Sequence, residues 1–182
     1  TIIFITHDVN EAFKLGDRVA VMKDGVIEQI GTPEEILANP ANDYIAEFVQ
    51  DVDKTKVLQA KNIMFKPGAL VSIKDGPKVA IREMRDAGIS SVFVVDNERR
   101  LQGLVTIDDA LKALQERREL QDILIKDYYT TGPETSIEEL LPLASTTKYP
   151  LAVVDDNNKL LGIIVRVSVL SALINGQTEK EE

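Results

Sequence analysis

The chain of 182 residues contains no cysteine and only one histidine, His7. The absence of cysteine excludes disulfides, thiolate metal sites and cysteine nucleophiles. A single histidine excludes any metal site with several histidines, and any histidine-based triad not built on His7. The 21 basic residues are outnumbered by 30 acidic ones. The resulting net charge of −9 argues against a partner that is a nucleic-acid polymer, because such proteins need clustered lysine and arginine.

Long apolar runs are also missing. No stretch approaches the roughly 20 apolar residues that span a bilayer, and no signal peptide opens the chain. Hydrophobic residues nevertheless make up 44%, which excludes wholesale disorder. We therefore expect an acidic, cytosol-compatible globular chain of slightly more than one domain, at about 150 residues per domain.

The first third of the chain predicts a strand, a hairpin and short helices. Residues 1–5, TIIFI, are typical of a strand buried on both faces. A chain that begins inside such a strand is expected to be a piece of a longer protein. The Asp-Gly pair at 24–25 lies between two apolar runs and predicts a hairpin. The sequence TPEE at 32–35 predicts a capped helix start, and residues 42–49 predict a further helix.

Three segments, TIIFITHDVNEA, DRVAVMKDGVIEQIGTPEEIL and NPANDYIAEFV, resemble the C-terminal end of an ABC-transporter ATPase domain. The resemblance implies that His7 is the switch histidine, which contacts the γ-phosphate of ATP in that family. The alternative is a histidine that only satisfies local hydrogen bonds at a strand end. The chain contains no G-x-x-x-x-G-K-[ST] loop, and the family's signature motif and Walker-B strand are absent. We therefore expect residues 1–55 to be an ATPase fragment that does not hydrolyse ATP, a reaction that belongs to the intact, ATP-binding parent.

An internal repeat follows a charged segment at residues 51–61, which predicts a linker or a domain boundary. The sequence VVD at 94–96 recurs at 153–155, an offset of 59. The same offset relates further core and turn positions: Leu101 and Leu160, Gly103 and Gly162, Leu111 and Leu170, Ala113 and Ala172, Leu114 and Leu173. Such ordered agreement indicates two copies of one structural unit. Each copy predicts a helix, two strands and a helix that turns apolar residues inward: 76–88, 92–95, 101–106 and 108–114, then 137–144, 151–154, 160–165 and 167–174.

The segments VFVVDNERRLQGLVTIDDAL and LAVVDDNNKLLGIIVRVSVL resemble a tandem pair of cystathionine-β-synthase-type (CBS) domains. This resemblance implies an α/β (α+β) fold in which two β-α-β-β-α units pack as one module. It also implies a homodimer through the CBS domains, with clefts that often bind adenine nucleotides. We expect the first CBS domain at 56–118, the second at 119–176 and a short acidic tail at 177–182.

In CBS units that bind nucleotides, a G-h-h-T-x-x-D stretch places a hydroxyl near the phosphates and a carboxylate on the ribose. The first unit matches with Thr106 and Asp109, and Ser90 joins them as a candidate cofactor-binding residue. The alternative is that Thr106 and Asp109 only cap a helix. The second unit departs from the pattern, because Val165 and Ser168 occupy the matching places.

The second unit offers a different combination of side chains. Tyr149 supplies an aromatic face, Ile163 and Val165 an apolar floor, and Arg166 a guanidinium. These groups would suit a stacked purine with a phosphate nearby. The alternative is that Tyr149 packs on the surface while Arg166 pairs with an acidic neighbour.

An ABC ATPase end followed by tandem CBS domains resembles the ATP-binding subunit of an importer for glycine betaine, carnitine or choline. The resemblance implies a regulatory module tuned by cyclic di-AMP or by ionic strength, on the cytoplasmic side of a bacterial membrane and bound to transmembrane subunits. Because cyclic di-AMP is two-fold symmetric, we hypothesise that Tyr149, Ile163, Val165 and Arg166 line its site across a CBS dimer axis. The rival hypotheses are an AMP or ATP energy sensor and a ligand-free dimerisation module. The tail at 177–182 offers a salt-dependent contact to a basic surface. No metal site is expected.

Overall fold

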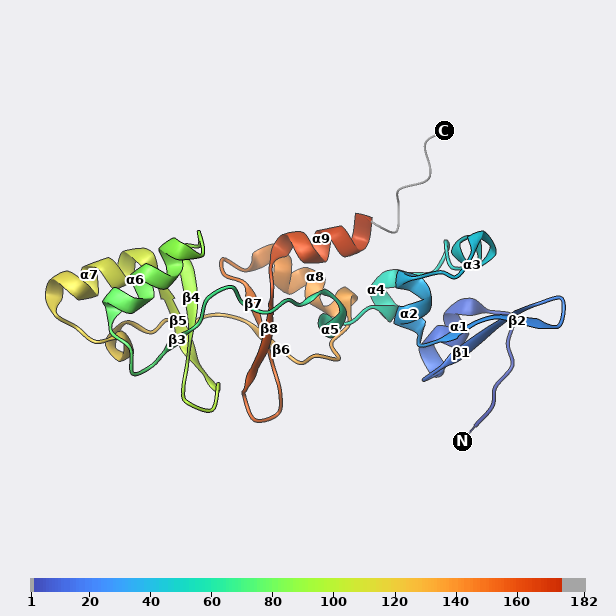
Figure 1. The fold of residues 1–182 in the computed structure, drawn as a ribbon, viewed down its shortest axis with the longest axis horizontal. Coiled ribbons are helices and arrows are strands. Elements are labelled where there is room, and N and C mark those ends of the chain that lie inside the picture. Colours follow the sequence, from blue (N-terminus) through green and yellow to red (C-terminus); the bar gives the residue numbers. More distant parts are fainter. Residues whose placement is uncertain (1, 175–182) are drawn as a thin grey trace.

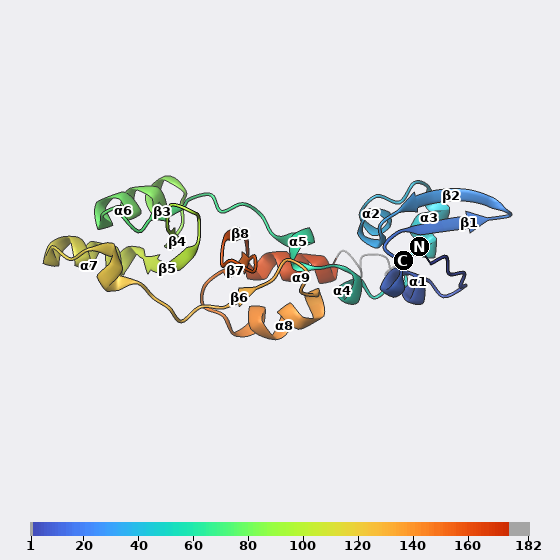
Figure 2. The ribbon, with the colours of Figure 1, turned by 90° about the horizontal axis from the view of Figure 1, so that it is seen from below.

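The computed structural model describes residues 2–174, so the acidic tail at 177–182 lies outside the described residues. Figures 1 and 2 show three parts in a row: an N-terminal unit, the second repeat unit and the first repeat unit. The chain runs from the N-terminal unit past the second repeat unit to the first, and then returns. Among residues 2–174, no helix combines the length and the apolar character needed to cross a membrane.

The N-terminal unit packs three helices and a hairpin around a small core. Its elements are α1 (Val9–Leu15), β1 (Val19–Lys23), β2 (Val26–Gly31), α2 (Pro33–Ala38) and α3 (Asp43–Phe48). The hairpin prediction is confirmed, because Asp24 and Gly25 take positive φ angles of 51° and 80° between the antiparallel strands. The α2 prediction is confirmed as well, since Thr32 and Glu35 form a capping box.

The prediction of a buried strand at residues 1–5 is wrong for the described residues 2–5. They form no strand, and the side chains of Ile2, Ile3 and Ile5 are 88–94% exposed. The physical reason is the lack of a neighbour: β1 and β2 pair with each other in a two-stranded sheet that does not include this segment. An apolar run becomes a core strand only where other strands accept its backbone hydrogen bonds.

Of the two interpretations of residues 51–61, the loose linker is wrong, because this segment is packed between two units. It contains the short helix α4 (Lys54–Val57) and the start of α5 (Ala60–Ile63). α4 contacts α1 and α2 of the N-terminal unit and α8 and α9 of the second repeat unit. Leu58 packs against the cores of both units.

The predicted repeat is confirmed, with two sheets of the same topology. The first unit comprises β3 (Val71–Ser72), α6 (Pro77–Asp86), β4 (Ser91–Val95), β5 (Leu101–Thr106) and α7 (Ile107–Glu116). The second comprises β6 (Thr130–Thr131), α8 (Ile137–Thr146), β7 (Leu151–Val154), β8 (Leu160–Ile164) and α9 (Arg166–Ile174). In each sheet the short first strand pairs parallel with the second, which pairs antiparallel with the third. Two of the positions predicted as core are wrong, since the side chains of Leu114 and Leu170 are both 47% exposed.

The two repeat units exchange their leading segments. α5 precedes the first unit in the sequence, yet Ala60 is fully buried in the core of the second. The 3-10 helix η1 (Leu120–Ile123) precedes the second unit, yet Leu120 is fully buried in the core of the first. Backbone bridges follow the same exchange, pairing Phe65 with Ile163 and Ile125 with Leu104. Each unit therefore needs a piece of the other to complete its core.

A further cluster of buried side chains joins the two sheets. This shared cluster contains Phe93, Val95, Leu101 and Leu104 of the first unit with Ala152 and Leu160 of the second. It is sealed by partly buried side chains at its edge: Leu70, Ile125, Tyr128, Tyr149, Val154 and Ile163. The two units therefore pack as one module.

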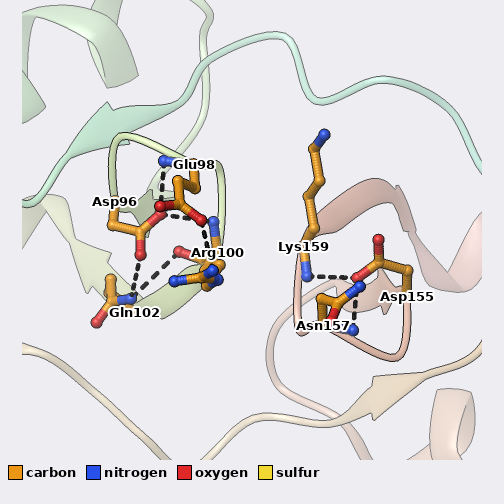
Figure 3. A network of polar contacts seen from close by, with 7 residues as sticks. All are labelled: Asp96, Glu98, Arg100, Gln102, Asp155, Asn157 and Lys159. Carbon is orange, nitrogen blue, oxygen red and sulfur yellow. Dashed lines mark hydrogen bonds and ion pairs between the residues drawn. The ribbon is translucent and has the colours of Figure 1, made fainter.

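The turns β4–β5 and β7–β8 have matching geometry where the units meet (Figure 3). In one, the Asp96 carboxylate accepts hydrogen bonds from the backbone N–H groups of Glu98 and Arg100, both at 2.9 Å. In the other, Asp155 accepts equivalent bonds from Asn157 and Lys159, also at 2.9 Å. The turns then bond to each other: the Leu101 N–H donates to the Asn158 oxygen, and the Leu160 N–H donates to the Arg99 oxygen.

Candidate nucleotide-binding site

The candidate residues of the first unit lie together at one end of its sheet. Thr106 ends β5 and caps α7, accepting a hydrogen bond from the Asp109 backbone N–H at 3.2 Å. Its hydroxyl donates to the Asp109 carboxylate at 2.5 Å. Ser90 is adjacent, because its backbone oxygen accepts from the N–H of Ile107, the first residue of α7. Thr106 and Asp109 thus form a helix cap, which was the alternative to a nucleotide site. A nucleotide bound here would have to compete with the hydrogen bond between their side chains.

The candidate residues of the second unit occupy equivalent positions. Tyr149 and Val165 lie 59 residues after Ser90 and Thr106. Tyr149 and Ile163 both pack against the shared cluster, and Val165 is half-buried between β8 and α9. The structure therefore brings the aromatic ring and part of the apolar floor to one region, at the edge of the contact between the two sheets.

Arg166 is held by backbone carbonyls. Its Nε donates to the Ala144 oxygen at 3.0 Å, and its Nη2 donates to the oxygens of Ser145 at 3.0 Å and Thr147 at 3.2 Å. These acceptors lie at the C-terminal end of α8, where a cation is favoured by unpaired carbonyls and the helix dipole. Arg166 is therefore paired with three backbone carbonyls, and not with the acidic neighbour of the alternative interpretation. Since a guanidinium has five N–H donors, these bonds fix its position and leave Nη1 for another acceptor.

Two neighbours of the candidate residues were not predicted from the sequence. The Thr147 hydroxyl donates to the Tyr149 oxygen at 2.6 Å and accepts from the Tyr149 N–H at 3.2 Å, while its own carbonyl binds Arg166. Thr147 is therefore hydrogen-bonded to both Tyr149 and Arg166. Lys148 places its Nζ 5.3 Å from the centre of the Tyr149 ring, adding a second positive charge beside it. A threonine two residues before the predicted aromatic is the only sequence signal for this link, and it is weak because threonine forms such turns in many loops.

Burial also changes the pKa of a tyrosine at the boundary between the units. Tyr128 contacts Phe93 edge-on, with ring centres 5.7 Å apart and an angle of 77° between the planes. Burial raises the pKa of the Tyr128 hydroxyl above its ordinary value of 10.0, because the ionised form loses hydration. The ring is therefore neutral at physiological pH and acts as part of the apolar contact between the units.

Other sequence candidates lie apart from this region. His7 is exposed and lies beside Asp8, which caps α1, in the N-terminal unit. Among residues 2–174, no cluster of three or more histidine, aspartate or glutamate side chains could hold a metal ion. A shallow pocket of about 440 Å³ opens elsewhere in the first unit, between the start of α6 and the segment after α7, and it contains none of the candidate residues.

Comparisons with known proteins concern both the fold and the kind of protein in which this sequence occurs. The family model described as "CBS domain" matches residues 60–116 and 120–175. The glycine betaine/carnitine transport ATP-binding protein GbuA of Listeria monocytogenes is 49% identical over 174 residues. That match covers 95% of this chain and 44% of the relative, so the chain spans less than half of the relative's length.

Solved structures agree with the fold. Staphylococcus aureus OpuCA matches with a TM-score of 0.58 at 24% identity, covering 62% of this chain and 97% of that structure. CBSX2 in complex with AMP matches with a TM-score of 0.55 at 22% identity, covering 64% of this chain and 96% of that structure. At these identities the likeness shows the fold alone.

Proposed function

Because the chain belongs to the CBS-domain family, we propose that it is the regulatory part of an ATP-binding subunit in an importer of quaternary amines. The similarity to GbuA over 95% of the chain supports its assignment to such an ATP-binding subunit. On this proposal the N-terminal unit belongs to an ATPase domain bound to transmembrane subunits on the cytoplasmic side of the membrane. The CBS module forms a homodimer and gates ATP-driven uptake of glycine betaine, carnitine or choline.

We further propose that the regulatory ligand is cyclic di-AMP, bound at the second unit across a dimer axis. The observation that supports this proposal is the fixed guanidinium of Arg166, whose Nη1 donors remain available. The guanidinium is hydrogen-bonded to Thr147, and Thr147 is hydrogen-bonded to Tyr149. A charged donor held in advance loses little conformational entropy when a phosphate binds. The Tyr149 ring and the apolar side chains of Ile163 and Val165 supply the stacking surface for a purine.

A thermal-shift titration with cyclic di-AMP tests this site in the 182-residue chain. At about 100 times the dissociation constant a ligand stabilises the folded state by about 2.7 kcal/mol, or about 5–10 °C in a chain of this size. Tyr149→Ala should abolish most of this shift by removing the stacking surface. Arg166→Lys should weaken binding about 10- to 150-fold, because a charged hydrogen bond contributes about 1.5–3 kcal/mol. Matched controls are Tyr129→Ala, at a 44% exposed tyrosine outside the site, and Arg82→Lys, at an exposed arginine paired with Glu83. Equal shifts in all variants would refute the site.

A second candidate function is supported by the first unit. There Ser90, Thr106 and Asp109 converge at one end of the sheet, and the related structure CBSX2 holds AMP. This arrangement would make the module an adenine-nucleotide energy sensor. Preference for AMP or ATP over cyclic di-AMP, removed by Asp109→Asn, would favour it. A third reading, a dimerisation module without a ligand, predicts a constant dimer and no thermal shift with any of these nucleotides.

A further inference from the structure

Helix α8 of the second unit is held at both ends. At its C-terminal end, three carbonyls accept hydrogen bonds from the Arg166 guanidinium. At its N-terminal end, the Ile137 N–H donates to the Leu58 oxygen at 3.0 Å. The loop that leads into α8 accepts two more bonds, from the Ala60 N–H to the Thr135 oxygen at 2.8 Å and from the Lys61 N–H to the Pro133 oxygen at 2.9 Å. The same helix therefore contacts the proposed phosphate-binding arginine and residues 54–61, here named the connecting segment.

The connecting segment is also part of the N-terminal unit. Val57 and Leu58 pack against the core that contains Phe13 and Ile36, and α4 contacts α1 and α2. Leu58 packs against both cores, so a displacement of its backbone changes contacts in both units. A segment bonded in this way transmits displacement, whereas a loose linker would absorb it.

Lys61 is a charged residue of the connecting segment that lies near carboxylates of both units. Its Nζ lies 2.7 Å from the Glu134 carboxylate, in the loop before α8, and 4.0 Å from the Glu34 carboxylate, in the first turn of α2. The Lys61 and Glu34 side chains are only 38% and 23% exposed, so this pair is screened less by salt than a fully solvated one. One ammonium thus lies between the N-terminal unit and the second repeat unit.

We propose that the connecting segment couples the Arg166 end of α8 to helix α2, with Lys61 as the positioning residue that carries the coupling. As regulation this rests on the proposed function, since an anionic ligand at Arg166 is the signal. The ligand's negative charge opposes the interaction between the guanidinium and the α8 carbonyls, which changes the preferred position of the helix. The loop at 133–137 moves with α8, the connecting segment moves with that loop, and Lys61 transfers the change to Glu34. The ligand drives this change only if it binds one arrangement more tightly than the other.

Hydrogen exchange of the 182-residue chain tests the coupling. The readout is the exchange rate of the amides that close the turns of α2, such as Ile36 in the helix and Asn39 at its C-cap, which donate to the Thr32 and Glu35 oxygens. Two independent perturbations are applied at the far end: cyclic di-AMP, and Arg166→Lys, whose single nitrogen replaces the two nitrogens, Nε and Nη2, that bond the three carbonyls. We expect each to change α2 exchange about 2- to 5-fold, the range of a partly exposed ion pair. Lys61→Gln should remove most of that response.

Lys112→Gln is the matched control, since Lys112 and Glu116 also lie 4.0 Å apart but both belong to α7. It should leave the α2 response unchanged. The coupling is overturned if α8 amides respond to Arg166→Lys while α2 amides do not, or if Lys61→Gln and Lys112→Gln behave alike. Calorimetry separates the two proposals. Binding of cyclic di-AMP without an α2 response overturns the coupling alone. A Lys61-dependent α2 response to Arg166→Lys without ligand binding supports the coupling and overturns cyclic di-AMP as the ligand.

Discussion

Replacing Phe93 by alanine tests whether the two repeat units share one core. Phe93 lies in β4 of the first unit with its side chain only 3% exposed, packed against residues of the second unit in the shared cluster. The centre of its ring also lies 5.7 Å from the centre of the Tyr128 ring, with the two planes at 77°. Phenylalanine-to-alanine changes in cores cost about 3–5 kcal/mol through lost burial and the cavity left behind. The aromatic pair accounts for about 0.5–1.5 kcal/mol of that loss.

Urea denaturation followed by circular dichroism and by hydrogen exchange measures this cost. A loss of about 3–5 kcal/mol is a large share of the roughly 5–15 kcal/mol that stabilises a typical domain. Because both units contribute to the cluster, amides of β4 and of β7 should lose protection together. Phe4→Ala is the matched control, since that ring is 53% exposed, and it should change stability by less than about 0.5 kcal/mol. A loss below about 1 kcal/mol for Phe93→Ala, or a loss confined to the first unit, would refute the shared core.

Three further predictions concern single positions. Gly162→Ala should cost about 1–3 kcal/mol in urea unfolding, because its new Cβ would lie 2.9 Å from the Met64 sulfur and 3.1 Å from the Phe65 carbonyl oxygen. Gly68→Ala, with nothing within 4 Å, is its control and should be nearly neutral. Thr106→Val should cost about 0.5–2 kcal/mol by removing the α7 cap, and an unchanged midpoint would contradict that role. Burial raises the pKa of Tyr128 in the folded state. The contribution of its neutral side chain to the free energy of unfolding should therefore be complete below pH 10 and be lost as the pH rises through the raised pKa. The urea midpoint measured from pH 8 to 11 checks this, and Tyr128→Phe should remove that part of the pH dependence.

The features that the sequence predicted well are those set by neighbouring residues. The Asp24-Gly25 turn, the Thr32 cap and the two repeat units follow from local φ preferences, local hydrogen bonds and a repeated apolar pattern. The features that it missed depend on contacts distant in sequence. The exchange of α5 and η1 between the units, and the packing of the connecting segment, place residues beside partners that composition does not indicate. The exposed segment Ile2–Ile5 shows the same limit, since its apolar pattern does not specify a neighbouring strand.

The candidate site divides in the same way. Tyr149 and Ile163 were predicted from residue type, and both pack at the contact between the units. The partners of Arg166 were not predicted, because they are backbone oxygens at the end of α8, and every residue type supplies such atoms. Thr147 was missed for a related reason: its role comes from the turn that joins Arg166 and Tyr149. Physical arguments from the sequence therefore found side chains suited to a purine and a phosphate, while the fold determined how they are held.

Isothermal titration of the 182-residue chain with cyclic di-AMP tests whether the second unit binds this ligand. We predict saturable heat with about one ligand per two chains, because a two-fold symmetric ligand binds across a dimer axis. Tyr149→Ala and Arg166→Lys should weaken binding while Tyr129→Ala and Arg82→Lys should not. The absence of heat at high micromolar ligand, or undiminished binding in both site variants, would contradict this prediction.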